Sequence, residues 1–222
     1  RAAQGMLAQL LRSQQDWPAL EKLLAKSRDL RALPKPELDG LRQELQVQRL
    51  TQDTDPKLAW SRLTRRQRRD PVLQAAHARA LINTGAKDVA ERFLRKSIAR
   101  HWNGELVRLY GHAHSDRMED QLHRAEQWSG SHKDDPDLLM TLARLHLEHN
   151  DRDKARDHLL EAVRLGGSRE GYLELGLLLE SMGESDKALQ CYRRGLQAGE
   201  SMFNEQDLRR ELQSQSRLML LD

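Results

Sequence analysis

The sequence has little of what disulfide-linked, membrane-spanning or aromatic-rich proteins need. Its single cysteine, Cys191, excludes an internal disulfide bond. Aromatic residues make up only 4% of the chain. No apolar run approaches the roughly 18–20 residues that a helix needs to cross a bilayer. We therefore expect this stretch of chain to be soluble by itself.

Catalytic sequence motifs are absent as well. The chain has no glycine-rich phosphate loop, no nucleophile elbow and no paired-cysteine metal site. His146-Leu147-Glu148-His149 superficially looks like the HExxH helix of zinc proteases. However, its histidines are three residues apart and glutamate precedes the second one, so the ligand geometry is not reproduced. We expect His146 to pack in the interior and His149 to face solvent, and we predict that the chain is not an enzyme.

A second group of histidines is the remaining candidate for metal binding. His112, His114 and His123 lie close together in the sequence. They could gather around a metal ion, but a loop with several histidines is more often simply solvated. We predict no metal site.

What the chain has in abundance is charge. Charged residues make up 32% and hydrophobic residues 38% of its 222 residues, which is typical of a solvated helical array and not of a β-sandwich or an α/β enzyme. The net charge of +3 and the isoelectric point of about 9.1 mildly favour acidic partners. The chain begins with Arg1, inside a predicted helix, so we interpret it as a fragment whose N-terminal part is missing.

One pattern occurs twice between residues 136 and 198. The two copies are offset by 33 residues, and the matching positions are Leu142-Ala143 and Leu175-Gly176, Asn150 and Gly183, Ala155 and Ala188, Leu159 and Tyr192, and Ala162 and Gly195. Small residues in mid-helix let two antiparallel helices approach closely. Asparagine and glycine tolerate the left-handed conformation that ends many helices. A fixed offset of this size indicates a helical repeat array, and the pattern resembles the tetratricopeptide (TPR) repeat.

Weaker copies of the pattern extend over the rest of the chain. We predict an all-α, right-handed superhelix of about six antiparallel helix pairs plus a C-terminal capping helix, in a single array over residues 1–222. The clearest repeats are expected at 71–102, 136–168 and 169–199, the degenerate units at 1–33, 34–70 and 103–135, and the capping helix at 204–221.

Aspartate followed closely by proline marks several expected helix starts. Aspartate is a favoured N-cap residue, and proline is favoured in the first helical turn. These starts are Asp16 with Pro18, Asp55-Pro56, Asp70-Pro71 and Asp135-Pro136. In the degenerate unit 34–70 we predict two helices over about 36–52 and 56–69, joined by a short polar loop.

Five arginines form the strongest charge feature of the chain, and they are Arg62, Arg65, Arg66, Arg68 and Arg69. One interpretation is the solvated face and C-terminal end of a helix, where cations complement the helix dipole. The other interpretation is an anionic contact. Phospholipid headgroups are then favoured over nucleic acid, because no aromatic residues are arranged for base stacking.

A TPR stack lines its concave groove with side chains from the first helix of each unit. Counting from Pro71, Gly104 and Pro136 places the following residues there: Arg79, Asn83, Arg108, His112, Arg144 and Glu148. Three arginines from three successive units are therefore expected to face one channel, where guanidinium groups can hold carboxylates bidentately. The alternative is that any charge-rich array places some arginines at such positions.

A longer pattern is more particular than the generic repeat. It comprises, in order, Trp60, Asp70-Pro71-Val72-Leu73, Ala80-Leu81-Ile82, Ala90, His101-Trp102, Glu105-Leu106-Val107-Arg108-Leu109-Tyr110-Gly111, Ala125-Glu126-Gln127-Trp128 and Leu138-Leu139-Met140-Thr141-Leu142-Ala143-Arg144-Leu145. Over residues 55–198 the sequence resembles the C-terminal TPR region of the HemY proteins of proteobacteria, which are associated with haem biosynthesis. Thr64 departs from the proline that is usual in that family.

The resemblance implies more than the residues themselves show. It implies anchoring in the inner membrane through a missing N-terminal pair of membrane helices, with the TPR region on the cytoplasmic side. It also implies a scaffold or haem-handling role in protohaem biogenesis, with haem-pathway enzymes as partners. A porphyrinogen oxidase activity is not implied, and the chain has no flavin-binding fingerprint.

We therefore predict a non-catalytic protein-interaction scaffold that holds acidic peptide segments or porphyrin propionates between Arg79, Arg108 and Arg144. No resident cofactor is expected, but haem binding stays open, with His112 as the candidate ligand. No nucleic acid partner is expected. Two alternatives remain, a general TPR adaptor for envelope protein assembly without haem, and a binder of anionic surfaces that works through Arg62 to Arg69.

Overall fold

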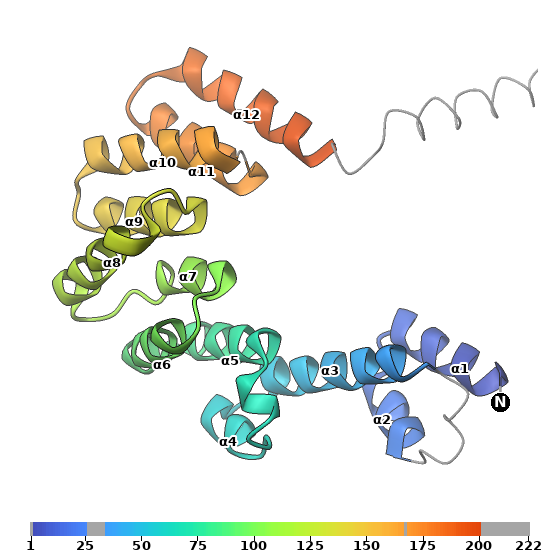
Figure 1. Ribbon diagram of the computed structural model, residues 1–222. Helices are drawn as coiled ribbons and strands as arrows, with labels where there is room; N and C mark the ends of the chain where they lie inside the picture. Colours follow the sequence, from blue (N-terminus) through green and yellow to red (C-terminus); the bar gives the residue numbers. More distant parts are fainter. Residues whose placement is uncertain (1, 26–33, 167, 201–222) are drawn as a thin grey trace, which may run out of the picture. The chain divides into compact units, whose positions relative to one another are not determined.

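The chain is helical throughout its described part. The computed structural model describes residues 2–25, 34–166 and 168–200, which form twelve α-helices, one short 3-10 helix and no strand (Figure 1). The predicted all-α class is confirmed. The helices fall into two compact units, residues 1–116 and 117–222. The boundary between these units lies inside the degenerate unit predicted over 103–135.

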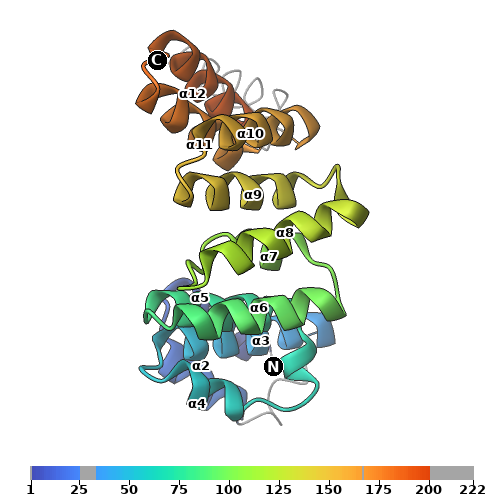
Figure 2. The same ribbon diagram turned by 90° about the vertical axis from the view of Figure 1, so that its left-hand side faces the viewer.

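The first unit contains seven α-helices and the 3-10 helix η1. Their bounds are α1 (Ala2–Ser13), α2 (Trp17–Ala25), α3 (Lys35–Gln52), α4 (Pro56–Ser61), η1 (Gln67–Arg69), α5 (Pro71–Asn83), α6 (Lys87–Arg100) and α7 (Gly104–Tyr110). Helices that follow one another in the chain pack together, as α5 and α6 do in Figure 2. In addition, α3 packs against α5, and α5 packs against α7. Each of these three is the first helix of its helix pair.

The second unit contains five α-helices. Their bounds are α8 (Met118–His132), α9 (Pro136–Glu148), α10 (Arg152–Gly166), α11 (Arg169–Ser181) and α12 (Ser185–Glu200). The pairs α9 with α10 and α11 with α12 are the two copies of the 33-residue pattern, and each pair packs tightly (Figure 1).

The predicted aspartate helix starts are confirmed by their hydrogen bonds. The Asp55 carboxylate accepts from the backbone N–H groups of Lys57 and Leu58 at 3.0 and 3.1 Å. Asp70 and Asp135 cap α5 and α9 in the same way. Each carboxylate satisfies N–H groups that have no partner within the helix.

Four helix ends share one backbone design. Asn150 has a φ of 58°, and its N–H donates to Leu147 O at 3.0 Å while Asp151 N–H donates to His146 O at 2.9 Å. These are the two bonds of a Schellman motif. The same pair of bonds recurs with the left-handed residue at Gln15, Gly85 and Gly183. The predicted left-handed residues Asn150 and Gly183 are therefore confirmed.

Small residues let the helices of a pair meet. Ala143, Ala155 and Ala188 are all buried. At Gly176 a Cβ atom would lie only 2.7 Å from Cδ1 of Tyr192, so the aromatic ring occupies the space that a side chain would need. The sequence pattern therefore places its small residues at the closest approach of two helices.

The prediction of one helix over 56–69 is wrong. The helix α4 ends at Ser61, and a turn separates it from η1. The cause is a reciprocal cap, in which the Gln67 side chain accepts from Thr64 N–H at 2.9 Å and the Gln67 N–H donates to Thr64 Oγ1 at 3.3 Å. This threonine and glutamine arrangement is a capping box, and it begins a new helical turn.

The capping helix predicted at 204–221 lies outside the described residues. Among the helices that are described, none is long and apolar enough to cross a membrane.

Candidate functional site

The predicted groove residues divide between the two units. Arg79, Asn83, Arg108 and His112 belong to the first unit, on α5, on α7 and just after α7. Asn83 is exposed, whereas Arg108 and His112 are half-buried. Arg144 and the half-buried Glu148 lie on α9 in the second unit.

Arg144 does not present an open cation. Only 7% of the surface of Arg144 is exposed to solvent. Its Nε donates to Glu174 at 3.0 Å, and its Nη2 donates to Glu170 at 2.8 Å and to Glu174 at 2.5 Å. Both glutamates belong to α11, so Arg144 joins the first helices of two successive pairs. Arg144, which was expected to face a channel, is therefore buried, and its charge is paired with these two glutamates.

Arg79 forms the equivalent contact in the first unit. It lies six residues before the left-handed Gly85, as Arg144 does before Asn150. Its Nη2 is 2.5 Å from Glu105 in the first turn of α7. Gln9, six residues before the left-handed Gln15, donates to Glu37 in the first turn of α3.

These contacts define a recurring clip between first helices. In each clip, a polar residue lies six positions before the left-handed residue that ends its helix. It bonds a glutamate at the start of the first helix of the next pair. The sequence interpretation assigned Arg79 and Arg144 to a ligand groove and overlooked their glutamate partners. The signal that could have revealed the clip is a glutamate 26 residues after each arginine, at Glu105 and Glu170.

The two histidines at the C-terminal end of α9 differ in burial. His146 is buried, as predicted, and its ring stacks on His158 with centroids 5.3 Å apart. Burial lowers the pKa of His146, and the nearby His158 and Lys154 lower it further. His149, the C-cap residue of α9, is half-buried with its Nε2 atom buried, so it faces solvent only in part. Among the described residues, no group of three or more His, Cys, Asp or Glu side chains is placed to hold a metal ion.

The five arginines of residues 62–69 have separate environments. Arg62 lies 3.6 Å from the Asp53 carboxylate. The Nη2 of Arg68 donates to the Ser61 carbonyl at 2.6 Å, and its Nε is buried. None of the ion pairs found among the described residues involves the other three, which are Arg65, Arg66 and Arg69. Because the helix ends at Ser61, these arginines do not share the single helical face that a continuous helix would have given them.

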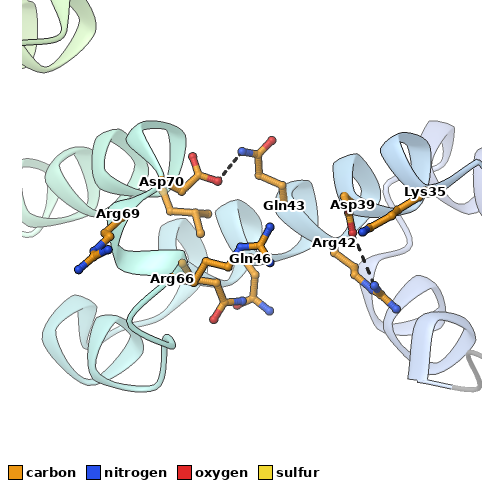
Figure 3. Close-up of a pocket in the computed structure, with 10 residues that line it drawn as sticks. Lys35, Asp39, Arg42, Gln43, Gln46, Arg66, Arg69 and Asp70 are labelled. Atoms are coloured by element: carbon orange, nitrogen blue, oxygen red, sulfur yellow. Dashed lines mark hydrogen bonds and ion pairs between the residues drawn. The ribbon is translucent and has the colours of Figure 1, made fainter. Parts of the chain in front are cut away.

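Arg66 and Arg69 help to line a cleft of about 670 Å³ between α3 and the segment that precedes α5 (Figure 3). One wall is α3, with Lys35, Asp39, Arg42, Gln43 and Gln46. The other wall contains the two arginines, Gln67, Asp70 and Leu73. In Figure 3, Lys35 and Asp39 lie at one end of the cleft and Arg69 lies at the other. This cleft was not predicted, because it depends on the early end of α4.

The charge of the cleft is mainly positive. Four cations line it against two carboxylates. One carboxylate, Asp70, is already bonded to Gln43 at 2.6 Å and to the N–H of Val72 at 2.9 Å. The other, Asp39, lies 3.7 Å from Arg42. Lys35, Arg66 and Arg69 take part in none of the ion pairs found in the described part of the chain.

Comparisons with known proteins support the repeat pattern. Residues 170–198 match the tetratricopeptide repeat family. The sequence has no significant match among curated proteins. The structure is similar to that of TTC0263, a thermophilic TPR protein of Thermus thermophilus, with a TM-score of 0.53 and 19% identity, over 87% of this chain and 95% of that one. A crystal structure of MamA has a TM-score of 0.44 and 16% identity, over 65% of this chain and 87% of that one.

The matched residues 170–198 cover most of α11 and α12, the second copy of the 33-residue pattern. The likeness to the thermophilic protein extends the fold, though not the function, over most of the chain. The chain therefore contains a tetratricopeptide repeat and has a TPR-like all-α fold.

Proposed function

We propose that the protein is a non-catalytic interaction scaffold that binds acidic segments of partner proteins. TPR-like helix pairs serve as binding scaffolds for other proteins. The observation that carries the choice of an acidic partner is the set of cations in the first unit that have no carboxylate partner in the described structure. Lys35, Arg65, Arg66 and Arg69, which lie at the start of α3 and around η1, are among these cations. They are largely solvent-accessible, and an acidic partner would neutralise them.

The proposal is tested with the full 222-residue chain and fluorescein-labelled peptides. Three peptides of equal length are compared, one rich in glutamate, one of serine and glycine, and one rich in lysine. Fluorescence anisotropy should show saturable binding of the acidic peptide alone, and its affinity should fall as salt is raised. Equal binding of all three peptides, or no binding of the acidic one, would contradict the proposal.

A haem-linked role is a second candidate, and its support is the resemblance to HemY proteins. In this version the protein is held at the inner membrane through a preceding segment, with its TPR region on the cytoplasmic side, and its partners are haem-pathway enzymes. Arg79 and Arg108 would face porphyrin propionates, and His112 would be the axial ligand. Arg144 is less suited to this role, because Glu170 and Glu174 already neutralise it, and Arg79 would first have to leave its partner Glu105.

Titration with haem tests this second candidate. A saturable shift of the Soret band that is lost in His112→Ala would support it. A TPR adaptor without haem involvement would show no saturable shift, and the His112→Ala variant would behave like the unaltered chain.

A further inference from the structure

We propose that the α3–η1 cleft is the site where an acidic segment of a partner protein binds, in an extended conformation along α3. This inference rests on the proposed scaffold function and names its binding site. The site lies in the least regular helix pair of the chain, and none of its residues belongs to the clips that join first helices.

The cleft exists because α4 is short. The second helices α6, α8, α10 and α12 have between 14 and 16 residues, whereas α4 has six. The buried residues of α4 and its C-terminal turn, Ala59 and Leu63, pack in one cluster with Leu50 near the C-terminal end of α3. The chain then turns back at Thr64 toward α5. The N-terminal half of α3 is left as one wall of an open cleft.

The lining residues of α3 show that the cleft runs along this helix. Lys35, Asp39, Arg42 and Gln46 are spaced by four, three and four residues, so they lie on one face of the helix. Eleven residues of α-helix span about 16 Å. An extended peptide covers that length with about five residues. The volume of about 670 Å³ also falls within the range of about 300–1,000 Å³ that is usual for ligand sites.

The chemistry of the lining favours a polypeptide segment. Lys35 at one end, Arg69 at the other and Arg66 in the lining can hold side-chain carboxylates, and the guanidinium groups can do so bidentately. The Gln46 amide provides a donor and an acceptor for peptide backbone groups between them. Asp39 lies in the same lining and would favour a segment that also offers a donor.

Nucleic acid and a bilayer surface fit the cleft less well. No aromatic side chain lines it, so there is no platform for base stacking. Two carboxylates in the lining would repel a continuous row of phosphates. A bilayer presents its headgroups on a broad surface, whereas these cations line a recess. The acidic polypeptide is therefore the occupant that the lining favours.

The experiment compares two double variants that change the charge by the same amount. Arg66→Glu with Arg69→Glu alters the cleft. Arg92→Glu with Lys96→Glu alters two cations on α6, outside the cleft. The probe is the glutamate-rich peptide, measured by fluorescence anisotropy at one salt concentration. We expect the cleft variant to weaken binding about tenfold or more and the α6 variant to weaken it less than about threefold.

Two further measurements make the result unambiguous. Circular dichroism and thermal unfolding must show that both variants keep the fold. The conservative variant Arg66→Lys with Arg69→Lys should restore most of the affinity, because it keeps the charge. Equal weakening by both charge reversals would overturn the cleft assignment but leave the scaffold function standing. Absence of acidic-peptide binding to the unaltered chain would instead overturn the scaffold function.

The source of the anion is tested in parallel. Vesicles of phosphatidylcholine with phosphatidylserine, and free pyrophosphate, are offered to the same variants. Neither should compete with the acidic peptide at matched charge concentration. Vesicle binding that is stronger than peptide binding and is lost in the cleft variant would overturn the choice of a polypeptide partner.

Discussion

In the α9–α10 pair the second helix has 15 residues and its partner has 13, whereas in the α3–α4 pair the second helix has six residues and its partner has 18. In the regular pair α9 is buried from Leu138 to His146, and this stretch includes Arg144. The irregular pair leaves the N-terminal half of α3 beside an open cleft. The difference shows how one helix-pair design produces both a sealed interface and a ligand-sized recess.

The two pairs also treat their charges differently. In the regular pair, Arg144 is neutralised by two glutamates of the next first helix. In the irregular pair, Arg66 and Arg69 stay without a carboxylate among the described residues. A cation that stabilises the fold is buried and paired, whereas a cation available to a partner is accessible and unpaired. Sequence position alone does not separate these two cases.

The largest effect on this comparison is expected from overpacking a regular pair. Gly176→Leu places a side chain where the Tyr192 ring already packs, so it should lower the free energy of unfolding by about 3 kcal/mol. Chemical denaturation measures the change. Gly130→Ala is the matched control, because a Cβ there meets nothing within 4 Å, and it should be neutral or slightly stabilising. Equal stability of Gly176→Leu and the unaltered chain would contradict the close approach of α11 and α12.

An effect of similar size is expected from acid at the aromatic cluster beside α4. His77 is 4% exposed and stacks on Trp60 at 4.5 Å, and burial lowers its pKa to about 4. The unfolded chain, with a pKa near 6.5, then binds more protons than the folded chain. The stabilisation is complete above pH 6.5 and is lost as the pH falls toward 4, by up to about 3 kcal/mol.

His77→Phe keeps a ring in the cluster and removes the titration. We expect the stability of this variant to depend less on pH between 6.5 and 4 than that of the unaltered chain, as measured by thermal unfolding across the range. His146 and His158 in the second unit also have lowered pKa values, mainly through burial, and they contribute with the same sign. Identical pH profiles for the variant and the unaltered chain would show that His77 is not held neutral.

The sequence was sufficient to predict the helix pairs, but it was insufficient to predict where α4 ends and which charged side chains are already paired. Mid-helix alanines and the turn residues Asn150 and Gly183 predicted the helix pairs, because close approach and left-handed turns restrict the residue types allowed. The early end of α4 was missed because Thr64 and Gln67 act locally, while the arginine-rich run around them looked helical. The pairing of Arg144 was missed because a periodic pattern does not show which charge a neighbouring helix presents.

The two arginine clips are expected to differ moderately in how much they contribute to the free energy of unfolding. Arg144→Met removes bonds to Glu170 and Glu174 in a buried position, so it should cost about 2–3 kcal/mol of unfolding free energy. Arg79→Met removes a contact from an arginine whose side chain is 51% exposed, and it should cost less than about 1 kcal/mol. Denaturation of both variants at low and high salt measures this. Equal costs would mean that burial does not distinguish the clips.

The smallest effect concerns the cap that ends the irregular pair. Thr64→Ala removes the hydroxyl that accepts from Gln67 N–H at 3.3 Å and donates to the Gln67 side chain at 2.9 Å, so it should lower stability by about 1 kcal/mol. Thr51→Ala is the matched control, because Thr51 Oγ1 only donates to carbonyls of its own helix, and its effect should stay below about 0.5 kcal/mol. Thr64→Ala should also weaken binding of the acidic peptide a few-fold, because the cap no longer holds Arg66 and Gln67 in place in the cleft lining. A Thr64→Ala variant that matches Thr51→Ala in both stability and peptide affinity would show that the cleft is not held open by this cap.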